Sequence, residues 1–146
     1  MEIFECRRDK FLISTDKRRL DLQFIFDFLA HRSYWAHGRT FAVISRSIEN
    51  SLCFGVYDGD QQVGFARVVT DYATFGWVCD LFILESHRTH SLGKWLVQSL
   101  VSHPSLATIR RLLLATKDAH ELYRKHAGFE PLSEPERWMT RVRSAG

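Results

Sequence analysis

The chain has 146 residues, of which 45% are hydrophobic and 13% aromatic, enough to build one compact domain spanning residues 1–146. Twenty Lys and Arg against 17 Asp and Glu leave a net charge of +3, and the basic residues are dispersed, which argues against nucleic acid as a partner. Cys6, Cys53 and Cys79 are odd in number and far apart, which excludes a disulfide framework and indicates a cytoplasmic protein. No apolar stretch approaches membrane-spanning length and the N-terminus is acidic, so neither membrane insertion nor secretion is expected.

Two helices are expected in the first third of the chain, after a short strand at residues 11–15. The first helix runs from Asp21 to Ser33, because its apolar residues lie three and four positions apart: Leu22, Ile25, Phe26 and Leu29. The second helix begins after Thr40, which is expected to cap it, and its buried stripe consists of Phe41, Ile44 and Ile48. Residues 33–39 between them form an aromatic, partly polar loop.

A hairpin and an apolar strand follow. Residues 52–57 and 63–69 are predicted to pair as antiparallel strands, because Asp58-Gly59-Asp60 between them favours a tight turn. Residues 77–84 are almost entirely apolar, as expected for a central strand covered on both faces.

The rest of the chain predicts a crossover between parallel strands. An amphipathic helix ends at His103-Pro104, and its apolar residues are Leu92, Trp95, Leu96 and Leu100. Residues 109–116 are the next apolar strand, and a right-handed crossover would make it parallel to residues 77–84. A short helix capped by Asp118 ends at Gly128, and residues 137–142 are expected to add a final strand.

The segment from Arg88 to Lys94 has the features of a phosphate-binding loop. It connects the end of a strand to the start of a helix, where free backbone N–H groups and the helix dipole favour an anion. Gly93 would let a ligand approach the backbone closely. Taken alone, the pattern describes an ordinary helix start more often than a phosphate site.

Three segments between Leu52 and Val142 resemble, in order, the motifs of the GCN5-related N-acetyltransferase (GNAT) family. Arg88, Ser91 and Gly93 fall on the family's Arg/Gln-x-x-Gly-x-Gly/Ala loop, and residues 80–83, Asp-Leu-Phe-Ile, are similar to its preceding strand. The downstream matches are Thr116, Ala119, Leu122, Tyr123 and Gly128-Phe129. The resemblance implies an α+β (α/β) fold of three layers: a central mixed, mostly antiparallel sheet flanked by helices, with a parallel strand–helix–strand core that binds acetyl-CoA.

The resemblance also implies how acetyl-CoA is bound. The backbone of Leu81, Phe82 and Ile83 would pair with the pantetheine arm, and the Thr116 hydroxyl would bind a pantetheine amide. Arg88 and the amides of the following loop would hold the pyrophosphate, namely those of Thr89, His90, Ser91, Leu92, Gly93 and Lys94. Ser91 departs from the family because it replaces a glycine; it fits if its φ is ordinary, whereas a positive φ at this position is expected to weaken binding. Ala127 is a second departure, an extra residue before the terminal glycine.

Candidate catalytic and acceptor residues each have two interpretations. Tyr123 matches the family's acid, which would protonate or hydrogen-bond the departing thiolate; alternatively its ring packs and its hydroxyl faces water. Asp80, the one charge in its apolar strand, would attract or deprotonate the amine, or would equally form an ion pair with an arginine such as Arg67. Tyr34 and Trp35 either wall the acceptor pocket, as the family implies, or cap the core.

These observations predict an N-acetyltransferase that moves an acetyl group from acetyl-CoA to an amine of a small molecule or protein, directly in a ternary complex. The alternative is a non-catalytic acyl-CoA-binding module, because Ser91 and Thr89 carry side chains where the family's loop usually has none. No metal is expected, since the histidine pairs, such as His87 with His90, lack carboxylate or cysteine neighbours at ligand spacing. A homodimer is compatible with the sequence, which does not determine the oligomeric state.

Overall fold

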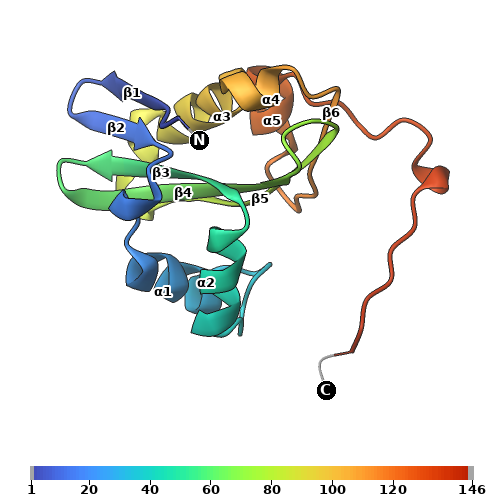
Figure 1. Cartoon of the computed structure of the whole chain (residues 1–146), viewed down its shortest axis with the longest axis horizontal. Helices are drawn as coiled ribbons and strands as arrows, with labels where there is room; N and C mark the ends of the chain where they lie inside the picture. The colour runs from blue at the N-terminus through green and yellow to red at the C-terminus, as the bar shows by residue number, and fades with distance from the viewer. Residues whose placement is uncertain (1, 145–146) are drawn as a thin grey trace.

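The computed structural model describes residues 2–144 and is built on one six-stranded sheet with the strand order β1-β2-β3-β4-β5-β6 (Figure 1). Neighbouring strands are antiparallel except β5 and β6, which are parallel. The strands are β1 (Glu5–Arg8), β2 (Phe11–Ser14), β3 (Leu52–Asp58), β4 (Gln61–Thr70), β5 (Phe75–Ile83) and β6 (Arg111–Leu113). This mixed, mostly antiparallel sheet confirms the expected fold class.

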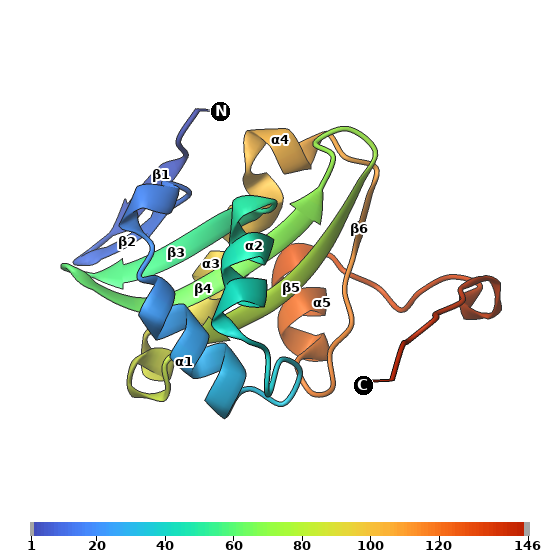
Figure 2. The ribbon, with the colours of Figure 1, turned by 60° about the horizontal axis from the view of Figure 1, so that its bottom comes forward.

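Helices cover both faces of the sheet (Figures 1 and 2). One face carries α1 (Leu22–Arg32) and α2 (Phe41–Glu49), and the other carries α3 (Leu92–Ser102), α4 (Pro104–Ala107) and α5 (His120–Ala127). The predicted cap of α2 is confirmed, because the Thr40 hydroxyl oxygen accepts from Val43 N at 3.2 Å; α1 is capped in the same way by the Asp21 carboxylate, which accepts from Phe24 N at 3.0 Å. Among residues 2–144, no helix has the length and apolarity needed to cross a bilayer.

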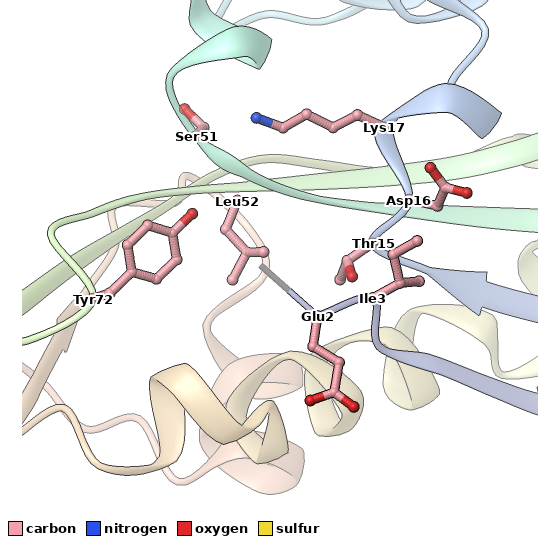
Figure 3. A pocket seen from close by; sticks show the side chains of 8 residues that line it. All are labelled: Glu2, Ile3, Thr15, Asp16, Lys17, Ser51, Leu52 and Tyr72. Atoms are coloured by element: carbon pink, nitrogen blue, oxygen red, sulfur yellow. The ribbon is translucent and has the colours of Figure 1, made fainter.

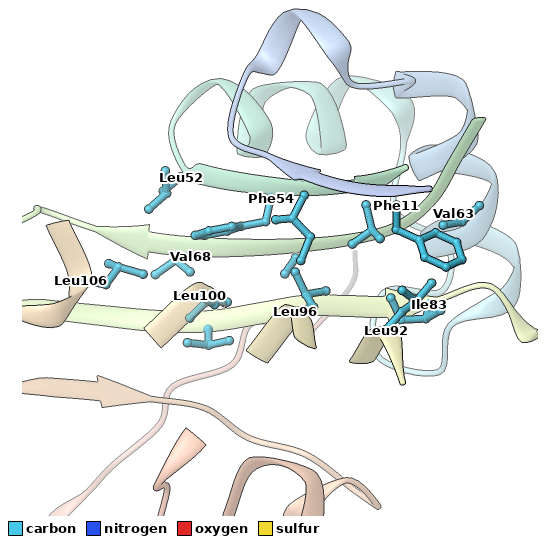
Figure 4. Close-up of a cluster of buried hydrophobic side chains, with 14 of the residues drawn as sticks. Phe11, Leu52, Phe54, Val63, Val68, Ile83, Leu92, Leu96, Leu100 and Leu106 are labelled. Carbon is cyan, nitrogen blue, oxygen red and sulfur yellow. The ribbon is translucent and has the colours of Figure 1, made fainter. Parts of the chain in front are cut away.

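Two apolar clusters hold these layers together. Under α3 and α4, Leu92, Leu96 and Leu100 pack against Phe54 and other side chains of the sheet (Figure 4). Under α1 and α2, the second cluster includes Ile25, Phe28, Leu29, Ile44, Ile48, Phe65 and Phe82. The Phe28 and Phe82 rings stack with centroids 3.8 Å apart, which fixes α1 against β5.

Phe41 does not belong to the buried stripe in which the sequence placed it. It is 43% exposed, and its ring packs on Phe26 from the neighbouring helix, with centroids 5.5 Å apart. Ile44 and Ile48 alone carry that face of α2 into the core, because Phe41 is the first residue of the helix and lies at its outer end.

The parallel pairing of β5 with β6 is short, and this matters for the site. The predicted crossover is confirmed, but only Phe75, Gly76 and Trp77 of β5 pair with residues 111–113. From Val78 to Ile83, β5 has β4 on one side and no described strand on the other. Six of the nine residues of β5 therefore have one edge that no strand covers, where backbone N–H and C=O groups can bind another partner.

Three sequence expectations for the C-terminal part are wrong in detail. In place of the strand expected at residues 109–116, only the three residues of β6 form a strand. The expected cap of α5 was Asp118, but the helix starts after Ala119, whose N–H donates to the Thr116 hydroxyl oxygen at 3.1 Å. No strand forms at residues 137–142. Glu134, with φ of 54°, and the short 3-10 helix at Pro135–Arg137 lead the chain away from the sheet, so the extended segment has no strand edge to pair with (Figure 2).

Candidate active site

A bulge in β5 marks the centre of the candidate site. Phe65 pairs with Phe82 and Arg67 with Cys79, so Asp80 and Leu81 together oppose the single residue Ala66. Asp80 adopts φ of 54°, a left-handed conformation that costs a non-glycine residue about 1–3 kcal/mol and persists only where surrounding contacts impose it. The bulge lies within the part of β5 that β6 does not pair with.

The Asp80 carboxylate supplies those contacts. Its side chain is 1% exposed and accepts from Arg67 Nε at 2.9 Å, from Arg39 Nη1 at 3.0 and 3.1 Å, and from Trp35 Nε1 at 2.9 Å. The arginine pairing predicted as one of the two alternatives is present. Both carboxylate oxygens are occupied, so Asp80 ties the loop after α1 to the sheet and has little capacity left to accept a proton from a substrate.

A cleft of about 550 Å³ opens beside this network, between the end of α1, the end of β5 and the starts of α3 and α5. Nine residues predicted for the site line it: Tyr34, Trp35, Leu81, Phe82, Ile83, Arg88, Ser91, Gly93 and Lys94. It is also lined by Phe28, Arg32, Ser33, Asp118 and Leu122, which were not predicted as site residues. Of these, Arg32 carried a usable signal, since it is a cation directly before the aromatic loop.

The other predicted residues lie next to the cleft rather than in its lining. Thr89 and His90 are exposed on the 3-10 helix η2 (Glu85–His90), and the Leu92 side chain is fully buried in the core. The Thr116 hydroxyl oxygen accepts from Ala119 N, in the turn before α5. Tyr123 is 8% exposed and follows Leu122, which does line the cleft.

The loop before α3 is held to the end of β5. Arg88 Nε donates to the Ile83 carbonyl at 3.1 Å, and Arg8 from β1 donates to the His90 carbonyl at 2.7 Å. These two contacts fix the turn so that the first amides of α3 lie at the free end of β5.

Ser91 occupies a conformation that suits glycine. Its φ of 56° and ψ of 28° are left-handed, and its side chain makes no capping hydrogen bond. Gly93 is different, because its φ is not positive, and a β-carbon added there would meet only Ile83 Cγ1 and Leu122 Cδ2, each at 4.0 Å. The open space beside Gly93 is part of the cleft, and it allows a ligand to approach the α3 backbone.

The Tyr123 side chain is buried, and its hydroxyl has no hydrogen-bond partner among residues 2–144. Burial raises the pKa of its phenol to about 12. Its ring packs edge-on against Phe129, with centroids 5.7 Å apart. The phenol is therefore fully protonated at neutral pH and available as a donor. Tyr34 lies near Tyr123, and its hydroxyl oxygen accepts a hydrogen bond from Lys117 N at 3.0 Å.

A smaller hollow of about 280 Å³ lies elsewhere, beside β2 and the start of β3 (Figure 3). It is lined by Glu2, Ile3, Thr15, Asp16, Lys17, Ser51, Leu52 and Tyr72, none of which was predicted as a site residue. Residues 2–144 also contain no group of three or more His, Cys, Asp or Glu side chains able to hold a metal ion. The larger cleft is therefore the candidate active site.

Several proteins that resemble this chain in sequence or in fold are described as acetyltransferases. A protein of Gibberella zeae described as a candidate acetyltransferase is 29% identical over 150 residues, which cover 87% of this chain and 83% of that protein. The crystal structure of a candidate GNAT acetyltransferase from Xanthomonas campestris is 41% identical, covers 91% of this chain and 93% of its own, and superposes with a TM-score of 0.88.

The family model for the acetyltransferase (GNAT) family matches residues 19–129. The chain belongs to the GNAT family, which confirms the family inferred from the three motif segments. The fold is also shared by the crystal structure of a predicted acetyltransferase from Clostridium acetobutylicum with acetyl-CoA, at 15% identity and a TM-score of 0.61, covering 84% of this chain and 92% of that one.

Proposed function

We propose that the protein transfers the acetyl group of acetyl-CoA to an amine of a small molecule or peptide, directly in a ternary complex. One observation carries the proposal: the unpaired edge of β5, residues 78–83, runs into the N-terminus of α3 within a single cleft. A free strand edge offers hydrogen bonds to an extended amide chain, and a helix N-terminus favours phosphate. The Clostridium acetobutylicum structure with acetyl-CoA supports this choice of co-substrate.

The residues present fit acetyl-CoA, which would supply an activated thioester. The backbone of Leu81, Phe82 and Ile83 would bind the pantetheine amides, with the Thr116 hydroxyl hydrogen beside them. The pyrophosphate would lie against Arg88, Lys94 and the amides of residues 89–94. Gly93 leaves the space that this approach requires.

The reaction needs few groups from the protein. The amine nitrogen bonds to the acetyl carbon and the C–S bond breaks, while the nitrogen loses a proton and the sulfur gains one. Tyr123 donates a hydrogen bond to the sulfur; since its pKa of about 12 lies well above the ~8.5 of a thiol, the hydrogen bond, rather than full proton transfer, is its contribution. Asp80 holds Trp35 and Arg39 in place, and water accepts the amine proton and supplies the proton that the departing thiolate takes up.

A binding and turnover experiment tests the proposal. Millimolar acetyl-CoA should raise the melting temperature, because a ligand of the native state stabilises it, and thiol release should appear with at least one amine in a panel. The rival is a non-catalytic acyl-CoA-binding module, which the left-handed Ser91 favours. Stabilisation without thiol release on any amine would support the rival, and no stabilisation at all would overturn both.

We also propose that this single N-acetyltransferase domain works in the cytoplasm. All three cysteines, Cys6, Cys53 and Cys79, are free thiols, as expected in a reducing compartment. Burial raises the pKa of the Cys79 thiol to about 11, so it is neutral and unreactive near the acceptor side.

A further inference from the structure

The acceptor side of the cleft carries an excess of positive charge. Asp80 is the buried carboxylate there, and it is shared by two guanidinium groups, Arg67 and Arg39, which leaves one positive charge unbalanced. Arg67 is nearly buried and also donates to the Ser51 hydroxyl at 3.0 Å. Arg39 is different: its side chain is 32% exposed, and its Nε and Nη2 atoms donate to no atom of residues 2–144. These free donors lie beside Trp35, which shares the same carboxylate oxygen.

Two further cations on this side lack carboxylate partners. Arg32 lines the cleft with its guanidinium carbon 4.9 Å from the centre of the Phe28 ring, and Lys117 Nζ lies 5.5 Å from the centre of the Tyr34 ring. Neither forms an ion pair with any acid among residues 2–144. Aromatic rings hold both charges in place without neutralising them.

The phosphate-binding end of the cleft has its own cations, so these are not needed there. Arg88 and Lys94 belong to the loop and first turn of α3, whereas Arg32 lines the cleft from the end of α1, and Arg39 stands behind the lining residue Trp35, with which it shares Asp80. Asp118 is the one acid among the described lining residues, and it stands at the start of α5. We call the cations Arg32, Arg39 and Lys117 together the cationic wall. A cationic amine without any acid group would be repelled by the positive charge of this wall.

We infer that the acceptor is a small amine that also carries a carboxylate or a phosphate group, with the anionic group bound by Arg32 and Arg39. This inference rests on the proposed function and names its substrate class. Guanidinium groups suit both anions, because they bind them with paired hydrogen bonds. The same positive charges lower the pKa of the amine nearby and so favour the neutral, nucleophilic form, which explains how the site works while Asp80 is occupied.

The test compares amines that differ only in the anionic group. Alanine is paired with alaninamide and phosphoethanolamine with ethanolamine, with spermidine as a polycation, and thiol release from acetyl-CoA is measured for each. We expect kcat/KM about ten- to a hundred-fold higher for the anionic member of at least one pair, with the preference reduced at high salt. The pair that shows it tells carboxylate from phosphate. Spermidine or the neutral amines reacting as well as their anionic partners would overturn the inference and leave the acetyltransferase function standing.

Substitutions of Arg32 then test whether the preference for anionic acceptors comes from the cationic wall. Arg32→Gln should raise KM for the anionic acceptor about tenfold, leave KM for acetyl-CoA unchanged, and be partly rescued by Arg32→Lys. Arg46→Gln is the matched control, because Arg46 is an exposed arginine on α2 outside the cleft lining. An increase in KM for acetyl-CoA instead would show that Arg32 binds the cofactor, and would overturn the assignment. Absence of both acetyl-CoA stabilisation and turnover would be a failure of the proposed function itself.

Discussion

Asp80 and Ser91 adopt the same left-handed backbone conformation on two sides of one cleft, but their side chains are in opposite situations. Asp80, with φ of 54°, accepts hydrogen bonds from three side chains, whereas Ser91, with φ of 56°, caps nothing. Strain at Asp80 is therefore imposed by contacts that need its carboxylate. At Ser91 the side chain makes no hydrogen bond with residues 2–144 that would compensate the strain. The Asp80 conformation is therefore required by the fold, whereas the Ser91 conformation calls for a ligand as its explanation.

The largest expected effect is at Asp80. Asp80→Ala leaves Arg67 without its buried partner, and we expect a loss of about 3–5 kcal/mol in the free energy of unfolding, measured by urea titration. Asp80→Asn is the matched control, since it keeps the shape, tolerates the left-handed conformation and retains one acceptor oxygen, so its loss should be smaller. Equal stability of Asp80→Ala and the native protein would mean that the bulge is not held by this carboxylate.

Tyr123, like Ser91, has a hydroxyl group that makes no hydrogen bond with residues 2–144. Tyr123→Phe removes no hydrogen bond within residues 2–144, so stability should change by less than about 0.5 kcal/mol. Turnover should fall about 100-fold, with KM for acetyl-CoA unchanged, if the phenol acts on the departing sulfur. Because burial puts its pKa at about 12, activity should show no loss from tyrosine ionisation between pH 7 and 10. Unchanged turnover in the variant would assign Tyr123 to packing alone.

Gly93 separates the needs of the fold from those of the ligand. Its φ is ordinary and an added methyl group meets nothing closer than 4.0 Å, so Gly93→Ala should leave the free protein as stable or slightly more stable. The methyl group enters the cleft, and we expect acetyl-CoA to bind about tenfold more weakly by calorimetry. Native affinity in this variant would show that the cofactor does not approach α3 at Gly93.

The fold was predictable where the signals are local. The cap at Thr40, the turn at Asp58-Gly59 and the helix stop at Gly128, with φ of 73°, each depend on residues a few positions apart. The strand expected at residues 137–142 is absent because a strand also needs a neighbouring edge to pair with. No local signal reports whether such an edge exists.

The sequence predicted where most of the site lies, but not which interactions its charged side chains make. The motif segments located most of the cleft lining, but Asp80 meets Arg39 across 41 residues of sequence, so its occupied state could not be deduced from the strand alone. The cationic wall was missed for the same reason. Whether Arg32 lacks an acid partner depends on every segment packed around it, and this is a property of the folded chain.

The smallest expected effect is at Ser91, and it tests directly the comparison between Asp80 and Ser91. Ser91→Gly relieves the left-handed strain and loses no capping bond, so the free protein should gain about 0.5–1 kcal/mol in unfolding free energy. Ser91→Ala keeps the strain and removes only the hydroxyl, so its stability should match that of the native protein. Calorimetry with acetyl-CoA then decides the role of the side chain. If serine is a tolerated substitute for glycine, Ser91→Gly binds as well or more tightly; if both variants bind more weakly, the hydroxyl is a ligand of the pyrophosphate, and the strain at Ser91 is compensated in the complex as that at Asp80 is in the free protein.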